Sequence, residues 1–559
     1  MDATLPLTLD HERVANEIKH WVRLTAACNS KCIFCLDAEA QDGRFMAFDD
    51  IQTEIRRGRD EKGATRLVVS GGEATLHPQF HDAVRYGKYV GYRWVQTVTN
   101  GQRLADRGYL LSALDAGLDE ITFSLHGHTP ELHDRLTRTK NGFENLMRGM
   151  VRAVRLDRCV VNVDVCINRQ NVEHLEAIVA LCARVGVREF DLLHIIPQGV
   201  AFENREELFY DVDQHADSLR RAFRLARHPD FHIWTNRFPV QHLEGMEELI
   251  QDPHKMLDEV GGRRRQFRRY LDTGAPIECR DKARCPHCFI EPFCSALDRH
   301  VSDQRAGAFT VWWVGDRHDL VDRRPPGTIQ VGTNTMPAAP VPVYLRAASF
   351  VDAVFPAGSR AVATRPEHLD QLAGVNVDVE VHLTKEMCAG LVGRAIAANW
   401  ILHAPTYLHA AESAALDPDY RGFFTGLAPG ARAQNLPACL APGAMLEAAP
   451  RILDASLFHQ TGEMAIDAFV DGYVQHEYRA KSLRCSSCAV NHACPGAQLQ
   501  YLRAHGFKQL QPLTQAVSVP VFTSPRLRDG VVPQPGSVRL PLPGNAPVPF
   551  IDTAPGRRS

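Results

Sequence analysis

The chain has 559 residues, of which 45% are hydrophobic and 23% charged, and a formal net charge of −3. This length exceeds one ordinary hydrophobic core and predicts two or three domains. The small net charge gives no reason to expect a nucleic-acid partner, and no stretch approaches the ~20 uninterrupted apolar residues of a membrane span. The first residues lack the basic and apolar segments of a secretion signal, so we predict a cytoplasmic protein.

Fifteen cysteines in such a protein favour metal binding over disulfides. Four of them stand singly and are interpreted as small core residues: Cys159, Cys166, Cys182 and Cys388. The other eleven form three groups: Cys28/Cys32/Cys35, Cys279/Cys285/Cys288/Cys294 and Cys439/Cys485/Cys488/Cys494.

The first 200 residues alternate short apolar runs with amphipathic stretches, which indicates strands and helices around a parallel sheet. Strands are expected at His20–Thr25, Arg66–Ser70, Trp94–Thr99, Glu120–Leu125, Val160–Ile167 and Glu189–Ile195. Helices are expected at Asp49–Glu61, Pro78–Gly91, Asp106–Ala116, Phe143–Leu156 and Val172–Val185. Six such units predict an α/β fold with a partial (βα)6 barrel, in which sites form at the C-terminal ends of the strands.

The first cysteine group follows the first strand with C-x3-C-x2-C spacing. Three thiolates on one loop can each bind one iron of a [4Fe-4S] cluster, which leaves the fourth iron without a protein ligand. A structural zinc site is the alternative, but closed zinc sites use four ligands, and the nearest downstream Cys or His is His77. We therefore predict a cluster at Cys28, Cys32 and Cys35.

The second strand ends in Ser70-Gly71-Gly72-Glu73-Ala74-Thr75. Glycines let the backbone approach a ligand closely, and the carboxylate can accept hydrogen bonds from an ammonium group. Gly-Gly-Glu alone is a common turn. A ligand-binding role is favoured here because the segment follows a strand and comes after the cysteine loop in the chain.

With these two segments, the chain resembles the radical SAM superfamily, whose open iron binds the amino and carboxylate groups of S-adenosylmethionine (SAM). In that family the Gly-Gly-Glu segment usually ends in proline and binds the methionyl amino group, whereas this chain has Ala74. The resemblance implies SAM contacts at Phe34 and Ile195 (adenine), Gly72 and Glu73 (amino group), Thr99, Ser124, Arg135 (carboxylate) and Asn168 (ribose).

Each of the later contacts also has a plain structural interpretation that the sequence leaves open. Thr99 precedes an Asn-Gly turn, Arg135 could form a surface ion pair, and Asn168 could cap a helix. Ile195 could be an ordinary core residue. His126 could be a proton donor or acceptor, or a wall residue.

Residues 201–310 begin with a charged helical stretch, and one more strand could follow at Ile233–Pro239. The basic run Arg263–Arg269 is interpreted as a solvated helix face. Cys279, Cys285, Cys288 and Cys294 then predict zinc or a second cluster. Similarity to the SPASM and twitch extensions of radical SAM enzymes favours iron–sulfur. The SPASM pattern has another cysteine where this chain has Asp298. The group therefore resembles a one-cluster, twitch-like site more than a full SPASM ligand set.

The second half carries the third cysteine group, which repeats the C-x2-C-x5-C spacing. Cys439 is its candidate fourth ligand by counting, although it could be a buried thiol or pair with the first auxiliary group. We expect a radical SAM core at 1–200, an extension with the first auxiliary cysteine group at 201–310 and a linker at 311–340. A small α/β domain at 341–511 and a proline-rich disordered tail at 512–559 follow. The small domain has expected strands Val343–Ala347, Ala361–Thr364 and Val375–Leu383 and a helix Lys385–Asn399.

The resemblance implies that a reduced cluster passes one electron to SAM, giving methionine and a 5′-deoxyadenosyl radical that takes a hydrogen atom from the substrate. The electron would come from a donor such as flavodoxin or ferredoxin, and two auxiliary clusters would serve the reaction. The leading hypothesis is a ribosomally made peptide as substrate. A small metabolite is the alternative, and an iron–sulfur sensor or scaffold is the non-enzymatic one. The sequence assigns no catalytic side chain and gives no oligomeric state.

Overall fold

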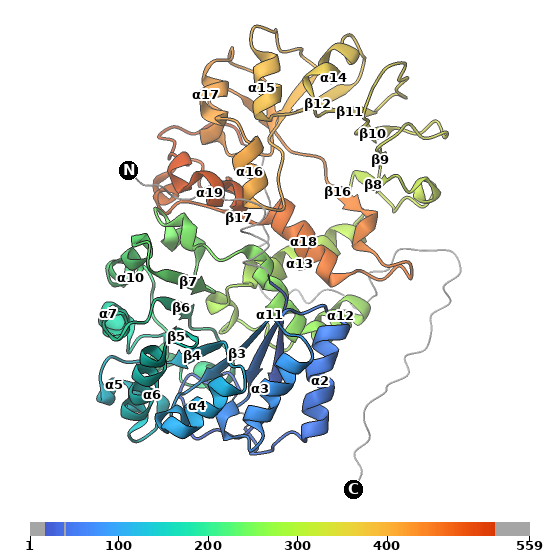
Figure 1. Cartoon of the computed structure of the whole chain (residues 1–559). Coiled ribbons are helices and arrows are strands. Elements are labelled where there is room, and N and C mark those ends of the chain that lie inside the picture. Colours follow the sequence, from blue (N-terminus) through green and yellow to red (C-terminus); the bar gives the residue numbers. More distant parts are fainter. Residues whose placement is uncertain (1–16, 38–40, 520–559) are drawn as a thin grey trace. The chain divides into compact units, whose positions relative to one another are not determined.

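The computed structural model describes residues 17–37 and 41–519 (Figure 1). The chain divides into two compact units, one formed by residues 1–255 with 279–291 and the other by residues 256–278 with 292–559. Each unit has its own sheet.

The first unit contains a seven-stranded parallel sheet whose strands follow one another in chain order. The strands are β1 (Lys19–Arg23), β2 (Arg66–Ser70), β3 (Trp94–Thr99), β4 (Glu120–Ser124), β5 (Val160–Ile167), β6 (Glu189–His194) and β7 (His232–Asn236). The six predicted strands are confirmed to within two residues. The further strand expected from Ile233 is also confirmed, because β7 pairs along β6 from Glu189↔His232 onwards and extends the six-unit partial barrel to seven strands.

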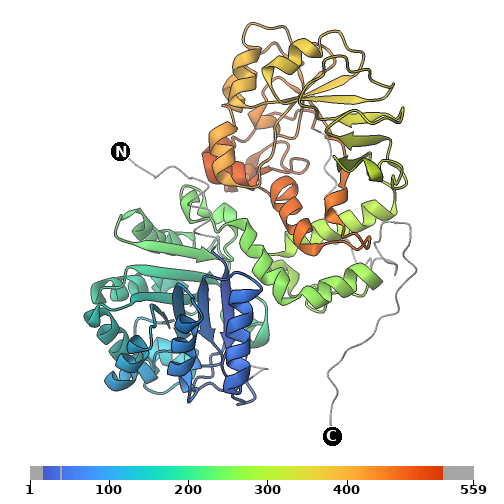
Figure 2. The ribbon, with the colours of Figure 1, turned by 45° about the vertical axis from the view of Figure 1, so that its right-hand side comes forward.

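Helices lie along the outer face of this sheet, as Figures 1 and 2 show. The outward positions are apolar and fully buried, for example Leu67, Val95 and Phe123. The intervening residues, for example Gln96, Thr122 and Asp164, point to the opposite face and are largely polar. Apolar and polar residues thus alternate along each strand, as a sheet with one apolar and one polar face requires. The helices of this unit are α2 (Phe48–Asp60), α3 (Phe80–Tyr89), α4 (Arg107–Asp115), α5 (Pro130–Thr137), α6 (Gly142–Leu156), α7 (Leu175–Val185), α8 (Gly199–Glu203), α9 (Arg205–Leu208) and α10 (Ala216–Phe223).

The second unit also contains a parallel sheet in chain order, from β8 to β15, and β16 joins the free side of β8. The strands are β8 (Val311–Gly315), β9 (Gln330–Thr333), β10 (Val343–Leu345), β11 (Arg360–Ala363), β12 (Asp378–His382), β13 (Trp400–His403), β14 (Arg432–Gln434), β15 (Met445–Glu447) and β16 (Ile452–Asp454). β17 (Arg479–Ala480) and β18 (Ala497–Gln498) form a separate antiparallel pair.

The helices of the second unit are short, apart from α13. They are α11 (Met256–Gly262), α12 (Arg264–Thr273), α13 (Glu291–Arg305), α14 (Pro366–Gln371), α15 (Lys385–Leu391), α16 (Ala410–Leu416), α17 (Tyr420–Thr425), α18 (Ile466–Gly472) and α19 (Leu499–His505). The helix predicted at Lys385–Asn399 is shorter than expected and ends at Leu391. Gly393, two residues later, has a positive φ of 76°, which is not helical.

The predicted linker at 311–340 is wrong, because this interval supplies β8 and β9. Trp312 is fully buried in an apolar cluster with Val331 and Leu453. The α/β sheet therefore begins near residue 311 rather than 341. Pro325-Pro326-Gly327, which suggested the linker, lies in the connection between these two strands.

The predicted tail lies mostly outside the described residues. Residues 512–519 contain no helix or strand, and the backbone N–H of Leu513 donates to the Sγ of Cys488 at 3.3 Å. Within the described ranges, no helix combines the length and the apolar character needed to cross a membrane.

Candidate functional site

The first cysteine loop is fixed by backbone hydrogen bonds from two neighbouring segments. The N–H groups of Lys31 and Ile33 donate to the carbonyls of Thr137 and Leu136, at 2.9 and 3.0 Å. The loop thus lies against the end of α5. The Asn204 amide donates to the Ile33 carbonyl at 2.8 Å, which ties the loop to the segment after β6 as well.

The three thiols of this loop are half-buried and free of disulfides. Burial raises the pKa of Cys32, and the adjacent Cys28 and Cys35 raise it further. The Ser30 N–H donates to the Sγ of Cys28 at 3.4 Å, and the Gln41 amide donates to the Sγ of Cys35 at 3.3 Å. Such a set favours thiolates once a positive charge lies among the sulfurs.

His77, the nearest downstream histidine, is engaged elsewhere. Its Nε2 lies 3.0 Å from the Met46 carbonyl oxygen, and its Nδ1 accepts from the Gln79 N–H at 3.1 Å. Both ring nitrogens are therefore used, which leaves three cysteines as the donor set of the loop.

The Gly71-Gly72-Glu73 turn packs directly on the start of the cysteine loop. The N–H groups of Gly72 and Glu73 donate to the carbonyls of Thr25 and Ala27, both at 2.8 Å. A Cβ on Gly72 would lie 2.4 Å from the Ala27 carbonyl oxygen, so no larger residue fits. The close approach that these glycines allow is therefore to the protein's own backbone.

The Glu73 carboxylate is buried and joins three segments. Its Oε1 accepts from the hydroxyls of Thr75 and Thr99, at 2.6 and 2.7 Å, and its Oε2 accepts from the Asn100 N–H at 2.7 Å. The Asn100 amide in turn donates to the Asn29 side chain in the cysteine loop at 2.7 Å. The structure thus brings the loop, the Gly72–Glu73 turn and Thr99 together.

The remaining predicted contacts are placed in different ways. Ser124 ends β4 beside Asp164, and Phe34 packs its ring edge-on against His126, with centroids 4.5 Å apart. Asn168 is fully buried within its own turn, where its Oδ1 accepts from the Gln170 N–H at 3.0 Å. Ile195 is buried just after β6.

Arg135 is exposed, and its Nε donates to the Gln170 side chain at 3.0 Å. His126 is buried, and burial holds its pKa well below the ordinary value. Its Nδ1 accepts from the Cys166 N–H at 3.2 Å. Of the two interpretations, a proton donor or acceptor and a wall residue, these observations favour the wall residue.

The first auxiliary group is divided between the two units. Cys279, Cys285 and Cys288 belong to the first unit and Cys294, on α13, to the second. Asp298, at the position of the further SPASM cysteine, accepts a hydrogen bond from the Tyr270 hydroxyl at 2.6 Å.

The second auxiliary group is brought together in one cavity. Cys439, Cys485, Cys488 and Cys494 all line it, and its empty volume is about 340 Å³ with open solvent included. Burial raises the pKa of Cys439 to about 11, with a further contribution from Cys494 and Cys485. Cys439, the fourth ligand inferred by counting, therefore lines the same cavity as the other three cysteines, although it precedes Cys485 by 46 residues.

Two carboxyl groups that the sequence did not single out lie on the polar face of the first sheet. Asp164 on β5 and Asp191 on β6 are register partners, and one oxygen of each is shielded from solvent without a hydrogen bond. Burial raises the pKa of Asp164 to about 6 and that of Asp191 to about 7, the latter also through the charge of Asp164. The signal was present in the sequence, where Asn162 and Asp164 alternate with Val161, Val163 and Val165.

Residues 22–182 match the family model of the radical SAM superfamily. The chain is 31% identical over 202 residues to "Probable GTP 3′,8-cyclase" of Saccharolobus islandicus (strain M.14.25 / Kamchatka #1), which covers 35% of this chain and 64% of that protein. It is 27% identical over 191 residues to the protein of the same name from Sulfurisphaera tokodaii, covering 34% and 60%. The chain thus spans less than two thirds of the length of these curated relatives.

Two solved structures are similar at low identity. SuiB of Streptococcus suis bound to the precursor peptide SuiA is 14% identical with a TM-score of 0.35, covering 44% of this chain and 54% of that one. The native anSMEcpe enzyme with bound AdoMet and the Kp18Cys peptide is 14% identical with a TM-score of 0.31, covering 37% and 59%.

The paired carboxyls predict a pH dependence of stability. Because the folded-state pKa of Asp191 lies above the unfolded value, the group favours the folded state less as the pH rises from about 4 through 7. Asp191→Asn should therefore stabilise the protein at pH 8 by up to about 4 kcal/mol, and by much less at pH 4. Thermal unfolding at the two pH values measures this. Asp115→Asn, an exposed carboxylate, is the control, and an Asp191→Asn variant with the wild-type pH dependence would contradict the assignment.

Proposed function

Because residues 22–182 are a radical SAM domain, we propose that Cys28, Cys32 and Cys35 hold a [4Fe-4S] cluster whose fourth iron binds SAM. The observation that carries this proposal is the direct packing of the cysteine loop on the Gly72–Glu73 turn. When bound, the cluster and SAM would supply one-electron cleavage of the sulfonium and a 5′-deoxyadenosyl radical that abstracts a hydrogen atom from the substrate.

The three-cysteine loop supports a cluster over a single zinc ion. Closed structural zinc sites use four ligands, and the nearest downstream histidine, His77, already uses both of its ring nitrogens.

The protein's own residues would orient SAM around this loop. Glu73 Oε2 accepts one hydrogen bond, from Asn100, and so can accept another from the methionyl ammonium group. Phe34 and Ile195 would contact the adenine, and Ser124, Asn168 and Arg135 would be polar contacts to the rest of SAM. Water exclusion would follow from the burial of these walls.

The auxiliary cysteines would hold two further clusters that exchange electrons with the active site. The four cysteines around one cavity support the second of them. Cys279, Cys285, Cys288 and Cys294 are proposed as the ligands of the first, and flavodoxin or ferredoxin as the electron donor.

We favour a ribosomally made peptide as the substrate. The carboxyls of Asp164 and Asp191 on the polar face of the sheet can accept hydrogen bonds from amide or hydroxyl groups, and they would repel a triphosphate. The relatives named GTP 3′,8-cyclase favour a nucleotide as the alternative, although the similarity covers 35% of this chain.

The proposed chemistry is tested by 5′-deoxyadenosine formation from SAM with dithionite under anaerobic conditions. Cys32→Ala should lower the rate at least 100-fold, because two thiolates cannot hold the cluster in place. Cys159→Ala, a cysteine outside the three groups, is the matched control and should keep the wild-type rate. A Cys32→Ala protein as active as wild type would disprove the cluster assignment. Stimulation by GTP and not by a candidate precursor peptide would favour the nucleotide.

The auxiliary assignment is tested by counting iron and acid-labile sulfide on anaerobically purified protein. Three four-iron clusters would give about twelve irons per chain. Cys485→Ala should lower this by about four without changing the binding of SAM. About four irons together with one or two zinc ions would rule out the auxiliary clusters.

A further inference from the structure

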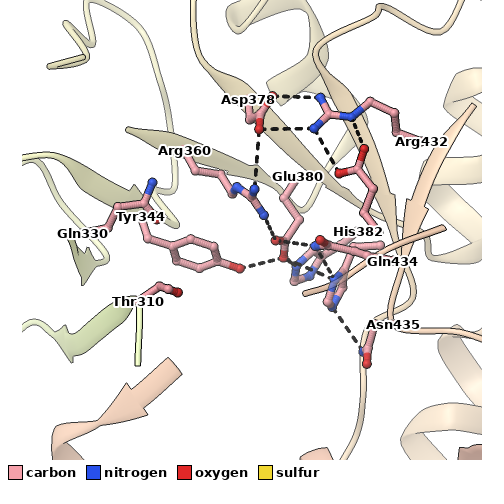
Figure 3. Close-up of polar contacts among 12 residues, drawn as sticks. Thr310, Gln330, Tyr344, Arg360, Asp378, Glu380, His382, Arg432, Gln434 and Asn435 are labelled. Atoms are coloured by element: carbon pink, nitrogen blue, oxygen red, sulfur yellow. Dashed lines mark hydrogen bonds and ion pairs between the residues drawn. The ribbon is translucent and has the colours of Figure 1, made fainter. Parts of the chain in front are cut away.

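Three potential metal ligands meet in the second unit, remote in sequence from every cysteine motif. Glu380 and His382 lie on β12, and His403 ends β13. The Nε2 of His382 lies 2.9 Å from Glu380 Oε1, and the Nδ1 of His403 lies 3.5 Å from the same oxygen. All three ligand atoms lie within 4.8 Å of one another. Figure 3 shows Glu380 and His382 among the polar side chains that surround them.

The fold explains this convergence. His382 and His403 are register partners at the C-terminal ends of adjacent parallel strands, so their side chains leave the same edge on the same face. Their rings stack with centroids 4.7 Å apart. Glu380, two residues before His382, points to the same face of the sheet and is completely buried.

The separations suit a tetrahedral ion. Zinc bound by nitrogen and oxygen at ~2.0–2.1 Å places its ligand atoms ~3.4 Å from one another. The two measured distances to Glu380 Oε1 bracket this value, so the ligands need only small shifts. Two histidines and one glutamate are also a donor set that catalytic zinc sites use, with a fourth position left for another ligand.

Neighbouring side chains orient the glutamate. The Tyr344 hydroxyl donates to Glu380 Oε1 at 2.6 Å, and the Gln434 amide donates to Oε2 at 2.7 Å. A guanidinium nitrogen of Arg360 lies 3.6 Å from the same Oε2. The two histidines lie beside the other oxygen, Oε1. Hydrogen-bonded partners of this kind fix ligand geometry in metal sites.

Gln434 lies beside the three ligands. Its side chain is buried, and its Oε1 has no hydrogen-bond partner among the described residues. Its Nε2 lies 2.7 Å from Glu380 Oε2 and 2.9 Å from the Nδ1 of His403. A metal bound through this Nδ1 would displace only the contact to His403, so the Gln434 amide would continue to orient Glu380.

We propose that Glu380, His382 and His403 bind one divalent zinc ion in the second unit, with water as the fourth ligand. This site is separate from the cysteine groups and does not depend on the function proposed for the first unit. Its ligands are nitrogen and oxygen, which distinguishes it from any zinc that cysteines could bind.

The test is zinc binding to the full-length, iron-loaded protein, followed by X-ray absorption at the zinc edge. About one zinc per chain should bind, with a first shell of nitrogen and oxygen at ~2.0–2.1 Å and no sulfur at ~2.3 Å. His382→Gln and His403→Gln should each weaken binding at least 100-fold while the iron count stays unchanged. His459→Ala, an exposed histidine of the same unit, is the matched control.

The proposal fails if no zinc binds beyond adventitious levels, if sulfur appears in the first shell, or if both histidine variants bind zinc like wild type. Tyr344→Phe covers the case in which the histidine variants do not fold. It removes one hydrogen bond to Glu380 and should lower zinc affinity 10- to 100-fold, and an unchanged affinity would also count against the site.

Discussion

The contact on which the first unit depends is the pair of backbone hydrogen bonds between the Gly72–Glu73 turn and the carbonyls of Thr25 and Ala27. It holds two strand ends so close that a side chain at position 72 would clash. Since Glu73 also receives hydrogen bonds from Thr99 and Asn100, three consecutive strand ends act as one support for the cysteine loop. A loop held in this way can keep three sulfurs in place while a fourth metal position stays open to a ligand.

The second unit uses the same principle with other residues. Its sheet also runs parallel in chain order, so the ends of neighbouring strands again bring together side chains that are distant in sequence. In the first unit these ends carry a glutamate, threonine and serine beside a cysteine loop. In the second they carry Glu380, His382 and His403. Along the chain, the spacing C-x2-C-x5-C recurs after the strands of each sheet.

Much of the first unit could be predicted from sequence. Its strands are rich in β-branched residues, and the segments between them have the periodicity of amphipathic helices. The linker prediction failed where proline and glycine lay between two short strands, since the burial of Trp312 is a tertiary fact. Counting ligands suggested that Cys439 completes the group of Cys485, but the sequence could not show that the two residues line one cavity. Asp164 and Asp191 were visible as a period of two, whereas His382 and His403 required the register of β12 and β13.

The central claim is that the iron left open by Cys28, Cys32 and Cys35 binds SAM directly. Electron–nuclear double resonance on the reduced protein, with SAM carrying ¹⁵N at the methionyl amino group, measures this most directly. We predict a ¹⁵N hyperfine coupling to the cluster that disappears in Cys32→Ala. Saturating SAM binding, shown by equilibrium dialysis, without any such coupling in the wild-type protein would contradict the account.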